Sequence, residues 1–356
     1  MFGLFLLAVL ASAFTYSRAI LAESKKENAP TASGTATFKK AVAVSTDQTT
    51  AKKQPADTKK TPAPNVQTTP KAATPAPSYV PITSSSPRGM NLYVSPLLEQ
   101  SGRPAAISSQ PVATWLGSWS GDIRSAAANT VSVAAGQNKL ATLVVYNIPG
   151  RDCGSYSAGG SSSADLYKAW IRQLASGIGP SKAMVILEPD ALAQIDCLSE
   201  PDQAVRYSLL ADAVNVLATQ TKAFVYIDAG HSGWIGAATM ADRLKQANVG
   251  QARGFSLNVS NFVATDKNTA YGNSISASTG KTFVIDTSRN GNGDNGEWCN
   301  PRGRALGPSP TTNVGGNVDA YLWIKVPGES DGTCNGGPSA GTWWNEYAQE
   351  LIANRH

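Results

Sequence analysis

The sequence predicts an α/β fold: a distorted parallel (β/α) barrel of TIM-like type with an open substrate cleft. Short apolar runs alternate with segments whose apolar residues recur every three or four positions, which is typical of parallel βα units. The runs are apolar almost throughout, as expected for strands covered on both faces. The 269 residues from 88 to 356 are a normal length for a barrel of about 250 residues.

The expected strands occupy residues 143–146, 184–187, 224–227, 255–259, 283–285 and 320–325, and the expected helices include 164–178, 202–220 and 238–247. Acidic residues follow five of these strands: Asp152, Glu188, Asp190, Asp228, Asp286, Glu329 and Asp331. An Asp at such a position also caps helices, so one of them alone would prove little. Barrel active sites lie at the carboxyl ends of the strands, so we expect these side chains to form one cluster.

The N-terminal part of the chain is not expected to be globular. Residues 1–17 are an apolar run that ends at Arg18, which is short for a membrane span. We interpret residues 1–22 as a signal peptide, with an uncleaved anchor as the alternative. Residues 23–87 are rich in Thr, Pro, Ala and Lys and predict a disordered linker or tail. It would be a solvated spacer or a weak electrostatic tether to an acidic surface. Residues 88–356 are then the catalytic domain.

Charge is distributed unevenly along the chain. The net charge of +5 resides in residues 23–87, which hold nine lysines and four acidic residues. Residues 88–356 hold 20 basic and 21 acidic residues, which argues against a nucleic-acid partner. No stretch beyond residue 21 is apolar enough to suggest membrane insertion. We expect a secreted, extracellular monomer without stable membrane insertion.

The chain has four cysteines: Cys153, Cys197, Cys299 and Cys334. With a signal peptide, an even count indicates disulfides, and four cysteines allow three connectivities. Pairing of neighbours closes the shorter loops. The only histidines are His231 and His356, so we expect neither a metal site nor a cofactor.

A carboxylate cluster with nearby tryptophans suits an uncharged polyhydroxy chain. Sugars offer hydroxyls to acidic side chains and apolar ring faces to Trp. Cleavage of a glycosidic bond needs one carboxyl that stays protonated and a second that activates water or attacks the sugar. Crowding or burial raises the pKa of the first carboxyl.

Seven segments together resemble glycoside hydrolase family 6, the inverting β-1,4-glucanases. They are VVYNIPGRDCGSYSAGG (144–160), MVILEPDALA (184–193), YIDAGHSGW (226–234), FSLNVSNF (255–262), VIDTSRNGNG (284–293), EWCNPRGRALG (297–307) and LWIKVPGESDGTC (322–334). They follow the family's order, and the resemblance as a whole covers essentially residues 90–356.

The resemblance implies a role for each matching carboxylate. Asp190 would be the general acid, and Asp152 would raise its pKa and support the transition state. Asp331 is at the position usually proposed for the base, and Asp228 at that of a further carboxylate that influences substrate binding. Tyr146 would crowd the sugar at the cleavage point.

The resemblance also implies a set of binding residues. Trp115, Trp234, Trp298 and Trp323 would stack on glucosyl units, and His231, Asn258, Lys325 and Glu329 would bind hydroxyls. Core packing is the alternative for each Trp, and a structural ion pair for Lys325. Many relatives have a serine where this chain has Ala158, so Ser157 is the candidate to hold the catalytic water. The family pattern supports neighbour pairing of the cysteines.

These expectations lead to a secreted endo-acting β-1,4-glucanase that inverts the anomeric configuration of a β-1,4-glucan. Only 43 residues separate Cys153 from Cys197, whereas exo-acting relatives carry longer loops that roof the cleft. The alternatives are an exo-acting cellobiohydrolase and a non-catalytic glucan-binding protein.

Overall fold

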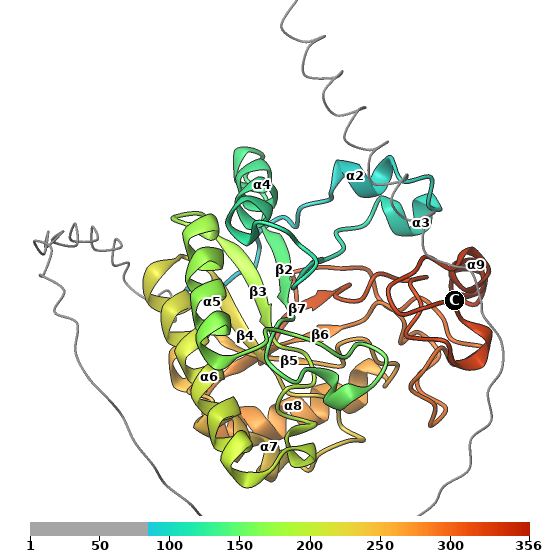
Figure 1. The fold of residues 1–356 in the computed structure, drawn as a ribbon. Coiled ribbons are helices and arrows are strands. Elements are labelled where there is room, and N and C mark those ends of the chain that lie inside the picture. The colour runs from blue at the N-terminus through green and yellow to red at the C-terminus, as the bar shows by residue number, and fades with distance from the viewer. Residues whose placement is uncertain (1–84) are drawn as a thin grey trace, which may run out of the picture. The chain divides into compact units, whose positions relative to one another are not determined.

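The computed structural model describes residues 85–356 (Figure 1). The predicted signal peptide (1–22) and most of the predicted linker (23–87) lie outside the described residues. The boundaries proposed for these segments and for the catalytic domain therefore stay predictions.

Seven parallel strands form one sheet in chain order, from β1 to β7. They are β1 (Thr114–Leu116), β2 (Ala141–Val145), β3 (Ala183–Leu187), β4 (Phe224–Asp228), β5 (Gly254–Leu257), β6 (Thr282–Asp286) and β7 (Val318–Leu322). Because all seven run the same way, their carboxyl ends meet at one edge, where the acidic residues are found.

The central strands are buried on both faces. In β3, Ala183, Val185 and Leu187 face the helices, and Met184 and Ile186 belong to a second core inside the curled sheet. Alternate residues of a strand point to opposite faces, so a strand with two apolar faces needs an unbroken apolar run. This confirms the interpretation of these runs as parallel strands.

The two ends of the sheet are joined by a short contact. The Ala113 amide donates a hydrogen bond to the Trp323 carbonyl (3.0 Å), and Val112 and Trp323 form a parallel bridge. The Trp115 indole also donates to the Ile324 carbonyl (2.8 Å). The sheet is thus a curled, nearly closed barrel, and the predicted fold class is confirmed.

Eight α-helices are present among residues 85–356, and the longer ones from α4 to α8 cover the outer face of the sheet (Figure 1). They are α2 (Pro96–Glu99), α3 (Ala105–Ser108), α4 (Ile123–Gly136), α5 (Ala164–Ile178), α6 (Glu200–Gln220), α7 (Ala237–Gln246), α8 (Thr265–Thr279) and α9 (Asn345–Ala353). Asp122, Ser163 and Ser199 cap α4, α5 and α6 by accepting backbone N–H bonds. No helix in this part of the chain is long and apolar enough to cross a membrane.

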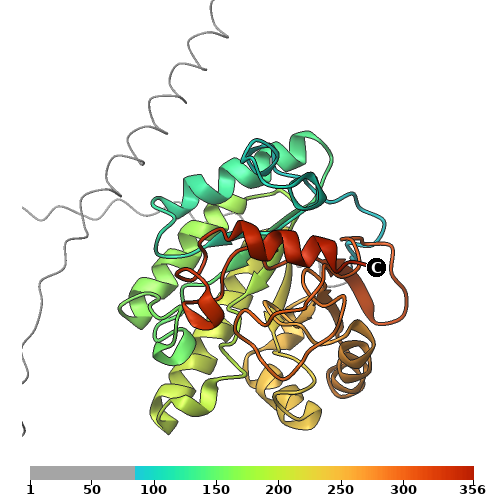
Figure 2. The same cartoon turned by 90° about the vertical axis from the view of Figure 1, so that its right-hand side faces the viewer.

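The C-terminal helix α9 has a separate apolar core. Figure 2 shows α9, in red, crossing in front of the strands. Tyr347 and Leu351 of this helix pack in one cluster with Ile107 and Trp323. Trp323 has no exposed surface, and its indole N–H donates to the Pro308 carbonyl (2.9 Å).

The burial of Trp323 corrects its prediction as a sugar-stacking residue. Trp323 comes directly after β7, where its ring faces α9 and not the cleft. Trp323 packs in the core, which was the alternative interpretation of this residue.

Candidate active site

The loops and strand ends of β2, β3 and β4 bring three carboxyl groups together, those of Asp152, Asp190 and Asp228. The Asp190 amide donates to Asp228 Oδ2 (2.9 Å), so the acidic residue that ends β4 holds the backbone of the β3 loop. Gln194 Nε2 donates to Asp152 Oδ1 (3.2 Å), which links the β2 loop to the same region. Asp152 and Asp190 both have positive φ, 56° and 68°. Non-glycine residues seldom adopt this conformation, and it is often retained at functional sites.

The environment of Asp190 favours its protonated form. Burial, followed by the negative charges of Asp228 and Asp152, raises the pKa of Asp190 well above its ordinary value. Burial also raises the pKa of Asp228, to about 7, against the hydrogen bonds it accepts from Asp190, Gly230 and Ser256. Because these donors stabilise the charge on Asp228, we place the retained proton on Asp190, which lines the cleft.

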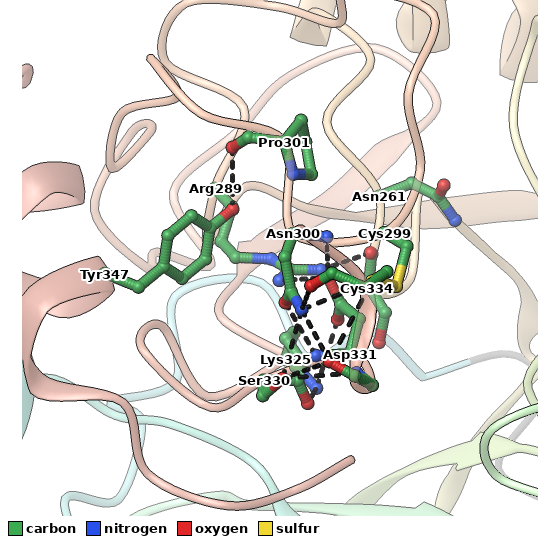
Figure 3. A network of polar contacts seen from close by, with 12 residues as sticks. Asn261, Arg289, Cys299, Asn300, Pro301, Lys325, Ser330, Asp331, Cys334 and Tyr347 are labelled. Carbon is green, nitrogen blue, oxygen red and sulfur yellow. Dashed lines mark hydrogen bonds and ion pairs between the residues drawn. A yellow bond between two sulfur atoms is a disulfide. The ribbon is translucent and has the colours of Figure 1, made fainter. Parts of the chain in front are cut away.

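Asp331 has the opposite environment (Figure 3). Its Oδ2 accepts from Arg289 Nη1 (2.8 Å) and the Asn300 amide (3.1 Å), and its Oδ1 lies 3.3 Å from Lys325 Nζ. Burial acts to raise the pKa of Asp331, but Arg289 and Lys325 outweigh it, so the pKa lies below its ordinary value. Asp331 is therefore ionised.

Two disulfides hold the loops that carry these carboxylates. Cys153 is bonded to Cys197, and Cys299 to Cys334. The predicted pairing of neighbours is confirmed. The first bond lies beside Asp152, and the second lies in the Asp331 network drawn in Figure 3.

A cleft of about 1140 Å³ opens between these loops. Four aromatic side chains that line it are unusually exposed: Trp119 (55%), Tyr156 (49%), Trp234 (37%) and Trp298 (55%). Large aromatic residues of a folded core are buried, so exposed aromatic faces along one cleft indicate a binding surface for flat apolar groups. Among residues 85–356, His, Cys, Asp and Glu form no group suited to a metal ion.

Tyr156 connects the two sides of this cleft. Its ring lies 6.0 Å from that of Trp298, and a Cβ built on Gly332 would come within 2.5 Å of the Tyr156 ring. Glycine at position 332 therefore permits the ring to rest on the loop that follows Asp331. The loops held by the two disulfides approach each other at this point.

Comparison with known proteins places this arrangement in a family. The model of glycosyl hydrolases family 6 matches residues 96–355. The chain belongs to this family.

Individual relatives agree with the assignment. Endoglucanase A of Cellulomonas fimi is 51% identical over 256 residues, which are 70% of this chain and 55% of that protein. Endoglucanase 1 of Streptomyces halstedii is 47% identical over 70% of this chain and 80% of that protein. The chain thus spans about half the length of the first relative. A solved endoglucanase of Mycobacterium tuberculosis, in complex with methyl-cellobiosyl-4-deoxy-4-thio-β-D-cellobioside, is 44% identical. The similarity covers 75% of this chain and 97% of that one, with a TM-score of 0.71.

Most residues expected at the site of this family 6 chain do line the cleft: Trp115, Tyr146, Asp152, Ser157, Asp190, His231, Trp234, Trp298, Lys325, Glu329 and Asp331. Trp115 and Tyr146 form an edge-to-face pair at 5.4 Å. The Ser157 amide donates to Asp152 Oδ2 (2.7 Å). Glu329 accepts from Arg103 Nη2 (3.0 Å), and burial raises the pKa of Glu329 against the Lys325 and Arg103 charges.

Asn258 does not have the predicted role. It is completely buried, its Nδ2 donates to the Asp286 carbonyl (2.9 Å), and its Oδ1 accepts from the Val263 amide (3.1 Å). Both ends of the amide are thus engaged within the protein, and the side chain ties β5 to β6. Direct binding of a glucan hydroxyl is excluded by this burial.

Three of the acidic residues expected in the cluster lie behind the cleft wall. Asp228, with 1% of its surface exposed, does not line the cleft, but it accepts a hydrogen bond from the amide of Asp190, which does. Glu188 and Asp286 are fully buried and accept backbone N–H groups of neighbouring loops. These three residues lie at strand ends, as expected, but they are not part of the cluster that lines the cleft.

Trp119, Tyr156 and Arg151 line the cleft and were missed in the sequence. Trp119 and Tyr156 stand in Gly/Ser-rich segments, GSWSGD and CGSYSAGG, where no apolar periodicity requires a core aromatic. A large aromatic residue in such a segment could therefore have been predicted to lie outside the core. The Arg151 guanidinium lies over the Trp119 ring (4.9 Å) and the Tyr146 ring (4.8 Å), which no sequence pattern reveals.

Replacing Arg289 with Met should destabilise the protein by about 3–5 kcal/mol, because it breaks a buried ion pair and leaves Lys325 as the remaining cationic partner of the buried Asp331 carboxylate. The depressed pKa of Asp331 contributes stability above its unfolded pKa of about 4, and this contribution is lost as pH falls through the folded pKa. The difference in free energy of unfolding between parent and variant should therefore be largest at neutral pH and should shrink below about pH 4. Urea unfolding at several pH values measures it.

Arg172→Met is the control, because Arg172 forms an ion pair with Asp212 on the surface and is 46% exposed. It should cost about 1 kcal/mol or less. Equal losses in both variants would contradict the electrostatic description of Asp331.

Proposed function

We propose that this protein hydrolyses internal β-1,4-glycosidic bonds of cellulose-like glucans with inversion of the anomeric configuration. The observation that carries the proposal is the contrast between two carboxyl groups on one cleft. Asp190 is held in its protonated form, and Asp331 in its ionised form. Inverting glycosidases need one carboxyl of each kind, as acid and as base. The endoglucanase names of the relatives support this activity.

In this mechanism Asp190 protonates the leaving glycosidic oxygen. Asp152 keeps the proton on Asp190 through its negative charge, and it stabilises the positive charge that develops on the sugar ring. Asp331 accepts the proton of the attacking water, either directly or through a second water. Ser157, next to Asp152, is proposed to help hold the attacking water.

The exposed aromatic residues are proposed to bind the glucan chain. Trp115, Trp234 and Trp298 present apolar surfaces to sugar rings, and we add Trp119 and Tyr156 to this set. His231, Lys325 and Glu329 supply polar groups from the same walls. We propose that Tyr146, which packs against Trp115 and lines the cleft, crowds the sugar at the cleavage point.

Internal cleavage requires a cleft that a long chain can enter from the side. The identity to two endoglucanases supports this mode. One observation favours the second candidate, an exo-acting cellobiohydrolase: Tyr156 rests on Gly332 and meets Trp298 across the cleft. A contact between the two walls is the arrangement expected of a roofed, exo-acting site.

We further propose that the protein is secreted and acts as a monomer without a cofactor. The two disulfides support an oxidising, extracellular environment. The signal peptide at residues 1–22 and the linker at 23–87 remain part of this proposal.

Cleavage mode is tested by viscosity and reducing ends on carboxymethylcellulose. Endo cleavage should lower the viscosity steeply for each bond cut, because internal cuts shorten the chains most. Release of cellobiose with little change in viscosity would show exo cleavage. Binding without new reducing ends would contradict hydrolysis altogether.

Replacing Asp190 with Ala should lower kcat on unactivated glucan by about 100-fold or more, because general acid catalysis contributes roughly 100- to 10,000-fold. The unfolding midpoint should stay close to that of the parent. With the parent enzyme, proton NMR of early products should show the α-anomer. An initial β-anomer would contradict inversion, and full activity of the variant would place the acid elsewhere.

A further inference from the structure

Glu188, the residue that follows β3, has a buried carboxylate with a specific set of partners. Its Oε1 and Oε2 accept from the Asn147 amide (3.1 and 3.0 Å), and its Oε2 also accepts from the Ile148 amide (3.0 Å). The side chain has no exposed surface, and its backbone has a φ of 51°. A buried carboxylate is costly unless it is hydrogen-bonded, so this group is well suited to fix the two amides.

The two amides form the start of the loop that carries Asp152. Asn147 also closes the far end of this loop, because the Ser161 amide donates to the Asn147 carbonyl (2.8 Å). Asn147 Nδ2 donates to Ser161 Oγ (3.0 Å) as well. Glu188 therefore holds the point where the loop leaves and rejoins the barrel.

Arg206 of α6 makes a second connection between the same two loops. Its Nη2 donates to the carbonyls of Pro149 (2.9 Å) and Gly150 (3.1 Å), just before Asp152. Its Nη1 donates to the carbonyl of Ala191 (3.3 Å), the residue after Asp190. Arg206 is 3% exposed, so these bonds are shielded from water.

We propose that Glu188 is a positioning residue for the reaction, and that with Arg206 it sets the placement of the Asp152 carboxylate relative to Asp190. The inference rests on the proposed function, because the consequence of this placement is the transfer of a proton from Asp190. It goes beyond that function by assigning a role to two buried residues that do not touch the substrate cleft.

The charges around these groups determine how the inference must be tested. Burial raises the pKa of Glu188 to about 7, against the Ile148 and Asn147 amides, the Tyr167 hydroxyl of α5 and the Arg206 guanidinium. Burial and neighbouring negative charges, among them that of Glu188, raise the pKa of Tyr146, which follows β2. Burial and the negative charges of Asp228 and Asp152 raise the pKa of Asp190. A change of charge at Glu188 alone must therefore be separated from a change of position.

The experiment compares Glu188→Gln with Arg206→Gln, which change the local charge in opposite directions and weaken the same loop connection. Positioning predicts the same effect in both: kcat on soluble β-glucan falls at least about tenfold, since a misplacement of about 1 Å can cost about 100-fold. KM should change little. The alkaline limb of the pH profile should move to lower pH in both, because a displaced Asp152 no longer raises the pKa of Asp190.

Charge alone predicts opposite shifts of that limb, to lower pH for Glu188→Gln and to higher pH for Arg206→Gln. Opposite shifts, or parental kcat and pH profile in the folded variants, would overturn the inference. Should Glu188→Gln fail to fold, Arg206→Gln decides: lower kcat with a shift to lower pH supports positioning, and any other result contradicts it.

Asp319→Asn is the matched control for loss of a buried carboxylate. Asp319 is also fully buried, but it lies toward the amino end of β7 and binds Arg253, Tyr226 and Thr282. This variant should lose stability and keep the parental kcat and pH profile. A parent protein that cleaves no β-glucan would contradict the proposed function, whereas an active parent with unaffected variants would contradict only the role of Glu188.

Discussion

Buried carboxylates that accept backbone N–H groups hold the carboxyl end of this barrel together. Asp228 at the end of β4 accepts from the Asp190 amide in the loop after β3, and Glu188 after β3 accepts from amides that follow β2. Asp286 at the end of β6 accepts from the Ser260 amide (3.0 Å) after β5 and the Lys325 amide (3.0 Å) after β7. Beyond the sheet, neighbouring strands no longer exchange backbone hydrogen bonds, and these buried carboxylates join the segments that follow the strands. The cleft walls depend on these bonds for their relative positions.

The same burial gives the site its chemistry. A carboxylate deprived of water gains a proton unless donors or cations compensate it. Asp331 has Arg289 and Lys325 as partners and stays ionised, while Asp190 faces Asp228 and Asp152 and keeps its proton. Two chemically identical side chains thereby acquire opposite roles. The positive φ angles of Asp190 and Asp152 cost conformational free energy, and the hydrogen bonds around these residues offset this cost.

The sequence predicted the elements with strong patterns and missed those with weak ones. The helix at 164–178 was predicted with its observed bounds, because its apolar residues recur at helical spacing. By contrast, β1 has only three residues, and the segment 265–279 (TDKNTAYGNSISAST) has few apolar residues to mark its buried face. The strand expected at 320–325 was offset from the observed β7, Val318–Leu322, because the residues after it are also buried.

At the site, the sequence predicted which residues carry the chemistry, but it did not predict how deeply each side chain is buried. Asp190 and Asp331 line the cleft as expected. Trp323 and Asn258 come from segments that also resemble the family, yet they pack inside. Whether a residue after a strand points to solvent or to a neighbouring loop depends on backbone angles and on partners distant in sequence. Neither is encoded in a local pattern.

Measuring the pKa of Asp190 is the decisive test of the proposed mechanism, because burial and the negative charges of Asp228 and Asp152 are what keep this carboxyl protonated. It can be measured by ¹³C NMR of labelled aspartate carboxyls over a pH titration, with Asp190→Asn used to assign the signal. We expect a pKa well above the ordinary value of about 4. A titration near 4, with Asp190 ionised at neutral pH, would contradict its role as the acid.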